Sequence, residues 1–370
     1  MTNLVFNRRE DQPMREDMKK ILVSMKEKRA SDLHITAFSP MHFRIDEQLL
    51  AVDEKQFSPD ECREAVYSLM TAEQIEKFER SRELDFSLQI EGAGRYRLNV
   101  FMQRGYVGCA VRLIPIRIKN IGECGLPETL VKGFCHAPKG LVLVTGATGS
   151  GKSTTLAAMI DEVNSSRRCH IVTVEDPIEF IHKNKKSIVD QRQVHSDTDS
   201  FSGALMHVLR QDPDVIMIGE LRDLETIQQA LIIADTGHLV FATLHTSDCI
   251  QSINRMVDVF PEHQQKQIRF QLSFVLLAII SQQLVPRKDS DGLVLATEML
   301  VANPAIRSMI RETKEHQIYS ILQTSQKDGM KTMNQGLVEL YKNGLISWED
   351  AVERSTNIEE LSKLAGKQWP

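Results

Sequence analysis

The sequence predicts an α/β protein in which a domain with a parallel sheet follows a smaller α+β domain. In the larger part, apolar runs rich in β-branched residues alternate with helical patterns, as in a parallel sheet with crossover helices. In the first third, short strand-like runs follow one another closely, which favours an antiparallel sheet. The length of 370 residues fits two or three domains.

The composition is that of an ordinary soluble globular protein, with 42% apolar and 26% charged residues. A net charge of −5 implies no general attraction to nucleic acid or anionic membranes. The six cysteines form no C-x-x-C pair, which argues against a zinc or redox motif and favours reduced thiols. Residues 1–16 lack the apolar core of a signal peptide, and the longest apolar run, residues 274–280, is too short to span a bilayer. We therefore expect a soluble, cytoplasmic protein.

The α+β domain is predicted to cover residues 17–114, after a polar tail at 1–16. Apolar spacing predicts helices at residues 18–28 and at about 59–80. Strand-like runs occupy residues 33–36, 42–45, 49–52, 84–89, 96–102 and 107–113. Between the last two runs, Gln103-Arg104-Gly105-Tyr106 is typical of a hairpin turn, so these strands should pair.

Residues 115–127 are predicted to be a linker, and residues 128–370 to form the second domain. Its strands are expected at residues 141–144, 171–174, 215–218 and 239–243, with helices between them. From about residue 264 to residue 364 we expect mostly helix.

The segment Gly146-Ala147-Thr148-Gly149-Ser150-Gly151-Lys152-Ser153 matches the phosphate-binding pattern G-x-x-x-x-G-K-[ST] at every fixed position. An apolar strand precedes it and a helical pattern follows, which is the context that this pattern needs. Glycines let consecutive N–H groups converge on an anion at a helix N-terminus. Lys152 should reach the β- and γ-phosphates, and Ser153 should hold Mg²⁺. We therefore assign binding of a nucleoside triphosphate to Gly146, Thr148, Gly149, Ser150, Gly151, Lys152, Ser153 and Thr154.

Two acidic clusters follow predicted strands, at the edge where open α/β sheets bind ligands. Glu175 and Asp176 could orient a Mg²⁺ shell or the attacking water, or else cap the next turn. Glu220 is the best candidate to polarise water, the alternative being a solvated glutamate in a loop. The residue before it is Gly219 and not an aspartate, so direct metal coordination at that strand end is missing.

Basic residues complete the candidate site. His245 ends an apolar strand, where an imidazole could contact the γ-phosphate or hold Glu220; a satisfied core histidine is the alternative. Arg222 is expected to pair with its neighbour Asp223 or with another subunit. Arg97 and Arg112 could neutralise phosphate charge from a neighbouring subunit, although exposed strand arginines are the default interpretation.

Together these segments resemble the secretion-ATPase superfamily of hexameric motors. The matching parts are the phosphate-binding loop, an "Asp box" at residues 171–179, an atypical Walker B segment at 212–223 and a "His box" at 237–246. Within the superfamily, the chain is similar to the type IV pilus retraction ATPases of the PilT and PilU kind. Residues 30–35 also match, and residues 305–312 resemble the retraction motif A-I-R-N-L-I-R-E.

The resemblance implies a RecA-like ATPase domain preceded by a PAS-like domain, and a homohexamer that binds ATP and Mg²⁺ between the two. It implies that Glu220 is the catalytic base, that Glu175 and His245 assist, and that Arg97 and Arg112 are interface arginines. Asp176 would contact the metal through water. The implied function is pilus disassembly and retraction at the cytoplasmic face of the inner membrane, with a platform protein and a paralogous ATPase as partners and no nucleic acid.

Some positions depart from the family pattern. The usual Q-R-E-V-G becomes Gln191-Arg192-Gln193-Val194-His195, which loses the acid and the glycine. Ala147 and Phe180 favour the PilU kind, whereas Asp212 and residues 305–312 favour the PilT kind. The missing tetracysteine module argues against the extension and type II secretion branches. A RecA-like nucleic-acid motor, and an accessory subunit that supports another motor, are the alternative interpretations.

Overall fold

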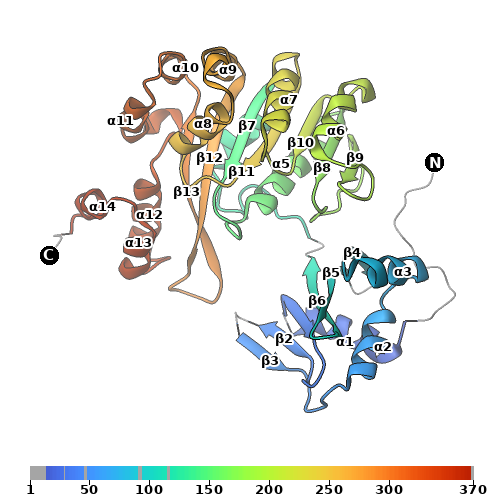
Figure 1. Cartoon of the computed structure of the whole chain (residues 1–370). Helices are drawn as coiled ribbons and strands as arrows, with labels where there is room; N and C mark the ends of the chain where they lie inside the picture. The colour runs from blue at the N-terminus through green and yellow to red at the C-terminus, as the bar shows by residue number, and fades with distance from the viewer. Residues whose placement is uncertain (1–13, 29, 46–47, 91–93, 115–116, 368–370) are drawn as a thin grey trace. The chain divides into compact units, whose positions relative to one another are not determined.

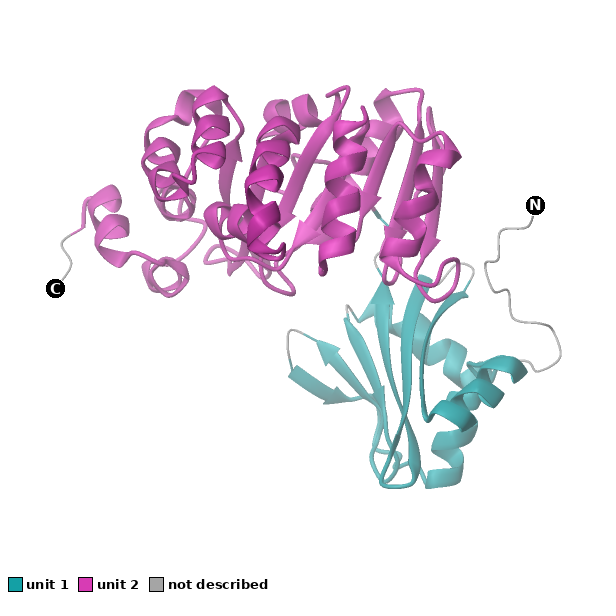
Figure 2. Cartoon of the chain, turned by 45° about the horizontal axis from the view of Figure 1, so that its top comes forward, with its two compact units in different colours: residues 1–117 teal, residues 118–370 magenta. Residues whose placement is uncertain are grey.

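The computed structural model describes residues 14–28, 30–45, 48–90, 94–114 and 117–367 (Figure 1). They form two compact units, residues 1–117 and 118–370 (Figure 2). Most of the predicted tail at 1–16, and residues 115–116 of the predicted linker, lie outside the described residues. None of the described helices is both long and apolar enough to cross a membrane.

The described residues of unit 1 form an antiparallel sheet and three helices. Its elements are α1 (Glu16–Glu27), β1 (Asp32–Ile35), β2 (His42–Ile45), β3 (Gln48–Ala51), α2 (Pro59–Tyr67), α3 (Ala72–Ser81), β4 (Glu83–Ile90), β5 (Gly94–Gln103) and β6 (Tyr106–Ile114). The six strands lie in the order β3-β2-β1-β6-β5-β4. On β5, Tyr96, Leu98 and Val100 are buried, and the Tyr96 hydroxyl donates to the Leu22 carbonyl over 2.7 Å. Because side chains alternate along a strand, Arg97 lies on the opposite face from this core.

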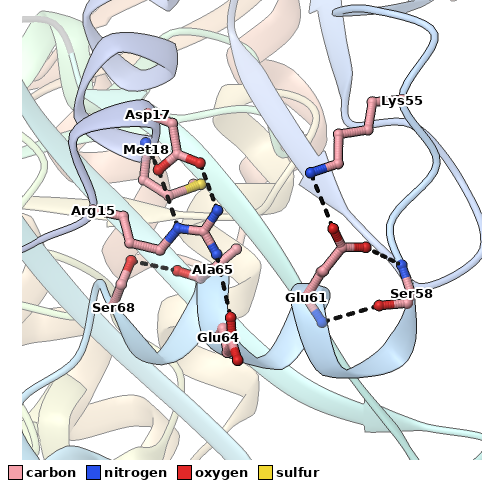
Figure 3. A network of polar contacts seen from close by, with 9 residues as sticks. All are labelled: Arg15, Asp17, Met18, Lys55, Ser58, Glu61, Glu64, Ala65 and Ser68. Atoms are coloured by element: carbon pink, nitrogen blue, oxygen red, sulfur yellow. Dashed lines mark hydrogen bonds and ion pairs between the residues drawn. The ribbon is translucent and has the colours of Figure 1, made fainter.

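The helical stretch predicted at 59–80 is two helices, not one. Thr71 begins α3 with a capping box in which Gln74 is the partner, and Ser58 and Glu61 form the same arrangement at the start of α2 (Figure 3). In this motif, side chains satisfy the backbone N–H groups that a helix start leaves unpaired. Figure 3 also shows Arg15 at the start of α1, between Asp17 and Glu64 of α2.

Unit 2 is a seven-stranded sheet covered by helices. Its strands are β7 (Gly140–Thr145), β8 (His170–Glu175), β9 (Ile188–Gln193), β10 (Val215–Ile218), β11 (Leu239–Leu244), β12 (Leu276–Pro286) and β13 (Leu293–Val301). Its α-helices are α4 (Glu128–Cys135), α5 (Lys152–Ser166), α6 (Phe201–Val208), α7 (Leu224–Asp235), α8 (Cys249–Asp258), α9 (Glu262–Val275), α10 (Pro304–Arg311), α11 (Ile318–Thr324), α12 (Met333–Lys342), α13 (Trp348–Arg354) and α14 (Ile358–Ala365). Short 3₁₀ helices occupy Leu209–Gln211, Glu315–Gln317 and Gln326–Asp328.

The strand order is β13-β12-β7-β11-β10-β8-β9, and all neighbours are parallel except the pair β12 and β13. Helices α4 and α5 share one hydrophobic core, α6 to α10 contribute to a second, and α12 to α14 pack in a third with β12 and β13. This is the predicted parallel sheet with crossover helices. The expected α/β fold is confirmed.

Strands β12 and β13 interrupt the region that we expected to be mostly helical from residue 264: α9 ends at Val275, and helices begin again only at Pro304. The cause is local. Residues 275–280 are apolar without a helical or alternating period, and such a run does not distinguish a buried strand from a buried helix.

Ile121 and Leu126, in the segment predicted as a linker, are buried in the same core as α4 and α5. Residues 118–127 therefore pack as part of unit 2. The remaining domain boundaries stay predictions.

Candidate nucleotide site

Four strands bring the candidate residues to one edge of the sheet. Strands β7, β11, β10 and β8 are successive parallel neighbours (Figure 1). The phosphate-binding loop follows β7, His245 follows β11, Glu220 lies just past β10, and Glu175 ends β8. This carboxyl edge is where open α/β sheets bind ligands.

The phosphate-binding loop has the backbone that its glycines permit. Gly146, Gly149 and Gly151 all have positive φ, at 142°, 81° and 88°. Around Gly146 there is no room for a side chain, because a Cβ would lie 2.5 Å from both the Gln282 carbonyl oxygen and Ser150 Oγ. Gly151 caps α5, so the loop leads directly into a helix N-terminus. Such a turn presents N–H groups to an anion.

Lys152 is held inside the loop. Its Nζ donates to the carbonyl oxygens of Gly146 and Ala147 over 2.8 and 2.9 Å. Burial lowers the pKa of Lys152, and the negative charges of Glu220 and Glu179 act against that effect. Ser150 Oγ is buried and makes no hydrogen bond to any described residue. A buried ammonium and an unsatisfied hydroxyl in a glycine loop fit a phosphate group.

Glu220 lies in a chain of polar contacts that begins at the phosphate-binding loop. Thr148 Oγ1 lies 3.5 Å from His245 Nδ1, and His245 Nε2 lies 3.4 Å from Glu220 Oε1. The other carboxylate oxygen is 2.7 Å from Arg222 Nη2. Burial acts to raise the pKa of Glu220, but the Arg222 hydrogen bond and the charges of His245, Arg222 and Lys152 outweigh it and lower the pKa. The carboxylate is therefore ionised at neutral pH.

The residues around Glu220 show why this Walker B segment is atypical. A Cβ on Gly219 would lie 3.2 Å from the Val174 carbonyl oxygen and 3.3 Å from Glu175 Cα. A side chain would press on the neighbouring strand, so glycine is favoured there. The expected pair between Arg222 and Asp223 does not form, because Arg222 pairs with Glu220 while Asp223 accepts the N–H of Thr226 at the start of α7.

Glu175 is buried at the end of β8, and its neighbour Asp176 is exposed. Burial raises the pKa of Glu175 to about 7, against the hydrogen bonds that its carboxylate accepts. Thr173 Oγ1 donates to Glu175 Oε1 over 2.7 Å, and Gln191 Nε2 donates to the same oxygen over 3.1 Å. We did not predict these two partners. The contact with Thr173 could have been predicted, because Thr173 lies two residues before Glu175 and therefore on the same face of the strand.

In the segment at residues 191–195, which departs from the family pattern, the last residue has an unusual backbone conformation. His195 has a φ of +67°, in the left-handed region that favours glycine. The family pattern Q-R-E-V-G, which the segment resembles, has glycine at this position, and the backbone of His195 has a conformation that suits glycine.

Arg97 and Arg112 lie directly opposite each other on β5 and β6 of unit 1. Arg112 Nε donates to Asp32 Oδ1 over 2.7 Å, and Arg97 Nε lies 3.8 Å from Asp85 Oδ1. The side chain of Arg112 is 67% exposed and that of Arg97 is 41% exposed, so both remain accessible. The carboxylates partly offset the repulsion between the two guanidinium groups.

The segment at residues 305–312 divides into packing and exposed residues. Ile306 and Ile310 are buried. Arg307 donates to the carbonyl oxygens of Ser273, Phe274, Leu276 and Ala302, over 2.5 to 2.8 Å. It therefore satisfies carbonyls at the end of α9, a position that favours cationic side chains. Arg311 instead lies 5.9 Å from the centre of the Phe274 ring.

A glycine loop with its buried lysine, and an ionised carboxylate two strands away, define a P-loop nucleoside triphosphatase. The family described as "Type II/IV secretion system protein" matches residues 7–354, and the chain belongs to this family. It is an ATPase of that family.

Similar proteins cover nearly the whole chain. The type IV pilus retraction ATPase PilT of Pseudomonas aeruginosa is 44% identical over 92% of this chain and 98% of its own length. The type IV pilus ATPase PilU of the same organism is 41% identical, over 93% of this chain and 90% of its own length. A crystal structure of the pilus retraction motor PilT with bound ADP has a TM-score of 0.86 at 48% identity, covering 93% of this chain and 99% of that chain. The predicted resemblance is confirmed.

Proposed function

We propose that this ATPase is a hexameric motor that powers type IV pilus disassembly and retraction from the cytoplasmic face of the inner membrane. The chain of contacts from Thr148 through His245 to Glu220 carries the proposal, because it connects the phosphate-binding loop to a candidate for activating water. The similarity to pilus retraction ATPases over most of the chain supports the proposal that the motor acts on a type IV pilus. The platform protein of the pilus machine and a paralogous ATPase are the proposed partners.

Each residue at the sheet edge has a proposed part in hydrolysis. Lys152 and the loop N–H groups bind the β- and γ-phosphates of ATP. Glu220 orients and polarises the attacking water, and its lowered pKa keeps the carboxylate ionised, so that both oxygens can accept hydrogen bonds. His245 positions Glu220 and, through its contact with Thr148, links Glu220 to the phosphate-binding loop. Glu175 assists from the next strand.

Mg²⁺ would be held by the hydroxyl of Ser153, with Asp176 contacting it through water, and it would neutralise charge on the phosphates. Among the described residues there is no cluster of histidine, cysteine and acidic side chains that could hold a metal by themselves. The ion is thus expected to arrive with the nucleotide.

Arg97 and Arg112 are proposed to act on the nucleotide of a neighbouring subunit. Their exposure and their shared position on one sheet face support such a contact. An arginine supplied from another subunit stabilises charge that develops during phosphoryl transfer.

Steady-state ATPase assays test the hydrolytic site. Lys152→Ala and Glu220→Ala should each abolish phosphate release by the purified protein. Glu225→Ala changes an exposed acid on α7 that accepts from Ser202, and it should retain full activity. Unchanged turnover in either of the first two variants would show that the site is wrongly assigned.

Mixed rings test the action between subunits. Arg97→Ala and Glu220→Ala proteins should each be inactive alone. Mixed before assembly, they form some interfaces with an intact Glu220 on one side and an intact Arg97 on the other, so part of the activity should return. A mixture as inactive as its components would contradict the role across the interface.

Two observations separate the alternatives. A nucleic-acid motor predicts ATPase stimulation by DNA, whereas the pilus motor predicts none. An accessory subunit of the PilU kind predicts that its own hydrolysis is dispensable when a second motor is present. For the proposed motor, deletion should leave cells piliated but unable to retract, and the Lys152→Ala gene should fail to restore retraction.

A further inference from the structure

Gln191, on β9, places its whole side-chain amide against the loop that follows Glu175. Its Nε2 donates to Glu175 Oε1 over 3.1 Å and to the Phe180 carbonyl oxygen over 2.8 Å. Its Oε1 accepts the N–H of His182 over 2.8 Å. Both amide N–H bonds are used, and rotating the amide by 180° would set an oxygen against two oxygens. The hydrogen bonds therefore define a single orientation.

The next residue on the same face of β9 extends the pattern. Gln193 Oε1 accepts the N–H of Ile178 over 3.3 Å, and its Nε2 donates to Ser196 Oγ over 3.3 Å. The two glutamines thus contact alternate residues of the loop, at 178, 180 and 182. Their side chains provide hydrogen bonds to backbone that has no strand partner at those positions, which a buried turn requires.

Strand register brings Gln191 to the carboxylate. β9 runs parallel to β8, with Gln191 opposite Thr173 and Gln193 opposite Glu175. Thr173 and Gln191 donate to the same Glu175 oxygen from two adjacent strands. Glu175 is only 8% exposed, so water offers little replacement for either donor. Loss of the Gln191 amide would leave the carboxylate and residues 178–182 less well held.

We infer that Gln191 is a positioning residue, which holds Glu175 and residues 176–182 in the arrangement needed for ATP hydrolysis. The inference rests on the proposed function, in which Glu175 assists that reaction. Gln191 acts through Glu175 and through the loop backbone. Its removal should slow the chemical step, because small misplacements of catalytic groups reduce rates far more than they reduce binding.

A double-mutant cycle on the full chain tests the inference, with kcat, KM and ATP dissociation constants measured for each variant. Gln191→Met should lower kcat by roughly 10- to 100-fold with KM changed less than about twofold. Gln191→Glu keeps an oxygen for His182 and loses both donors, so it should show the same loss even if the methionine variant folds poorly. Asp190→Asn, on the opposite face of β9 where Asp190 contacts His170, is the control and should leave kcat unchanged.

The cycle is completed with Glu175→Gln. In that background, replacing Gln191 should cost less than about a further twofold in kcat, because the two residues act as a unit. Equal fold losses in both backgrounds, or a loss confined to KM, would overturn the inference and leave Gln191 a merely structural residue. Wild-type turnover in Glu175→Gln would overturn the proposed role of Glu175 and the inference with it. A slow Glu175→Gln enzyme beside normal Gln191 variants would overturn the inference alone.

Discussion

Replacing Glu175 with glutamine should make the protein more stable at neutral and alkaline pH. In the folded chain, burial raises the pKa of Glu175 from 4.5 to about 7. Between these two values the folded state binds more protons than the unfolded state, so the free energy of unfolding falls as the pH rises. The destabilisation is fully present above the folded pKa and absent below the unfolded one. Glutamine keeps the shape of the side chain and does not titrate.

The size of the effect follows from the displaced pKa. A difference of about 2.5 in pKa, at roughly 1.4 kcal/mol for each pKa unit, destabilises the folded chain by about 3 kcal/mol at pH 8. At pH 5 only about 1 kcal/mol of this remains, because the folded carboxyl is then protonated and the unfolded one is partly so. Glu175→Gln should therefore exceed the wild type in stability by a margin that grows by about 2 kcal/mol from pH 5 to pH 8.

Urea unfolding followed by circular dichroism, at several pH values without nucleotide, measures this margin. Glu225→Gln, which makes the same substitution at an exposed acid on α7 that contacts Ser202, is the matched control. A margin for Glu175→Gln that does not change with pH, or that shrinks as the pH rises, would refute the reasoning from burial.

Two further predictions concern stability. His195→Gly should stabilise the chain by about 0.5–1 kcal/mol in denaturant titrations, because it relieves a left-handed backbone at a non-glycine residue; a lower midpoint would contradict this. Arg307→Ala should cost about 2–3 kcal/mol, because it removes the donor for several partly buried carbonyl groups at the end of α9. Arg311→Ala, which loses a cation–π contact and one long hydrogen bond to Ser273 Oγ (3.4 Å), should cost about 0.5–1 kcal/mol, and equal losses for the two arginines would show that the hydrogen bonds of Arg307 contribute little.

The sequence was sufficient for the elements whose pattern is local. The phosphate-binding loop, the strands before Glu175, Glu220 and His245, and the hairpin of β5 and β6 all form as predicted. Each combines a distinctive run of apolar residues with a clear turn or cap. The expectation that strand-end acids share one sheet edge held because parallel strands place all their carboxyl ends together.

Elements that depend on tertiary pairing could not be predicted in this way. β9, with the sequence I-V-D-Q-R-Q, has few apolar residues and becomes a strand by pairing with β8 at the sheet edge. The partnership of Gln191 with Glu175 arises from that pairing, and no spacing within either segment indicates it. The pairing of Arg97 opposite Arg112 could have been predicted from the sequence, because the two residues lie equally far from the predicted turn at Arg104-Gly105.

That turn has a consequence for the proposed contact between subunits. Arg104 and Gly105 both have positive φ, at 52° and 85°, and join β5 to β6 with only two residues between Gln103 and Tyr106. One inserted residue there would slide one strand past the other, and Arg112 would no longer stand opposite Arg97. The length of this turn therefore sets the alignment of the two arginine charges. In the proposed hexamer, each of the six interfaces between subunits would depend on that alignment.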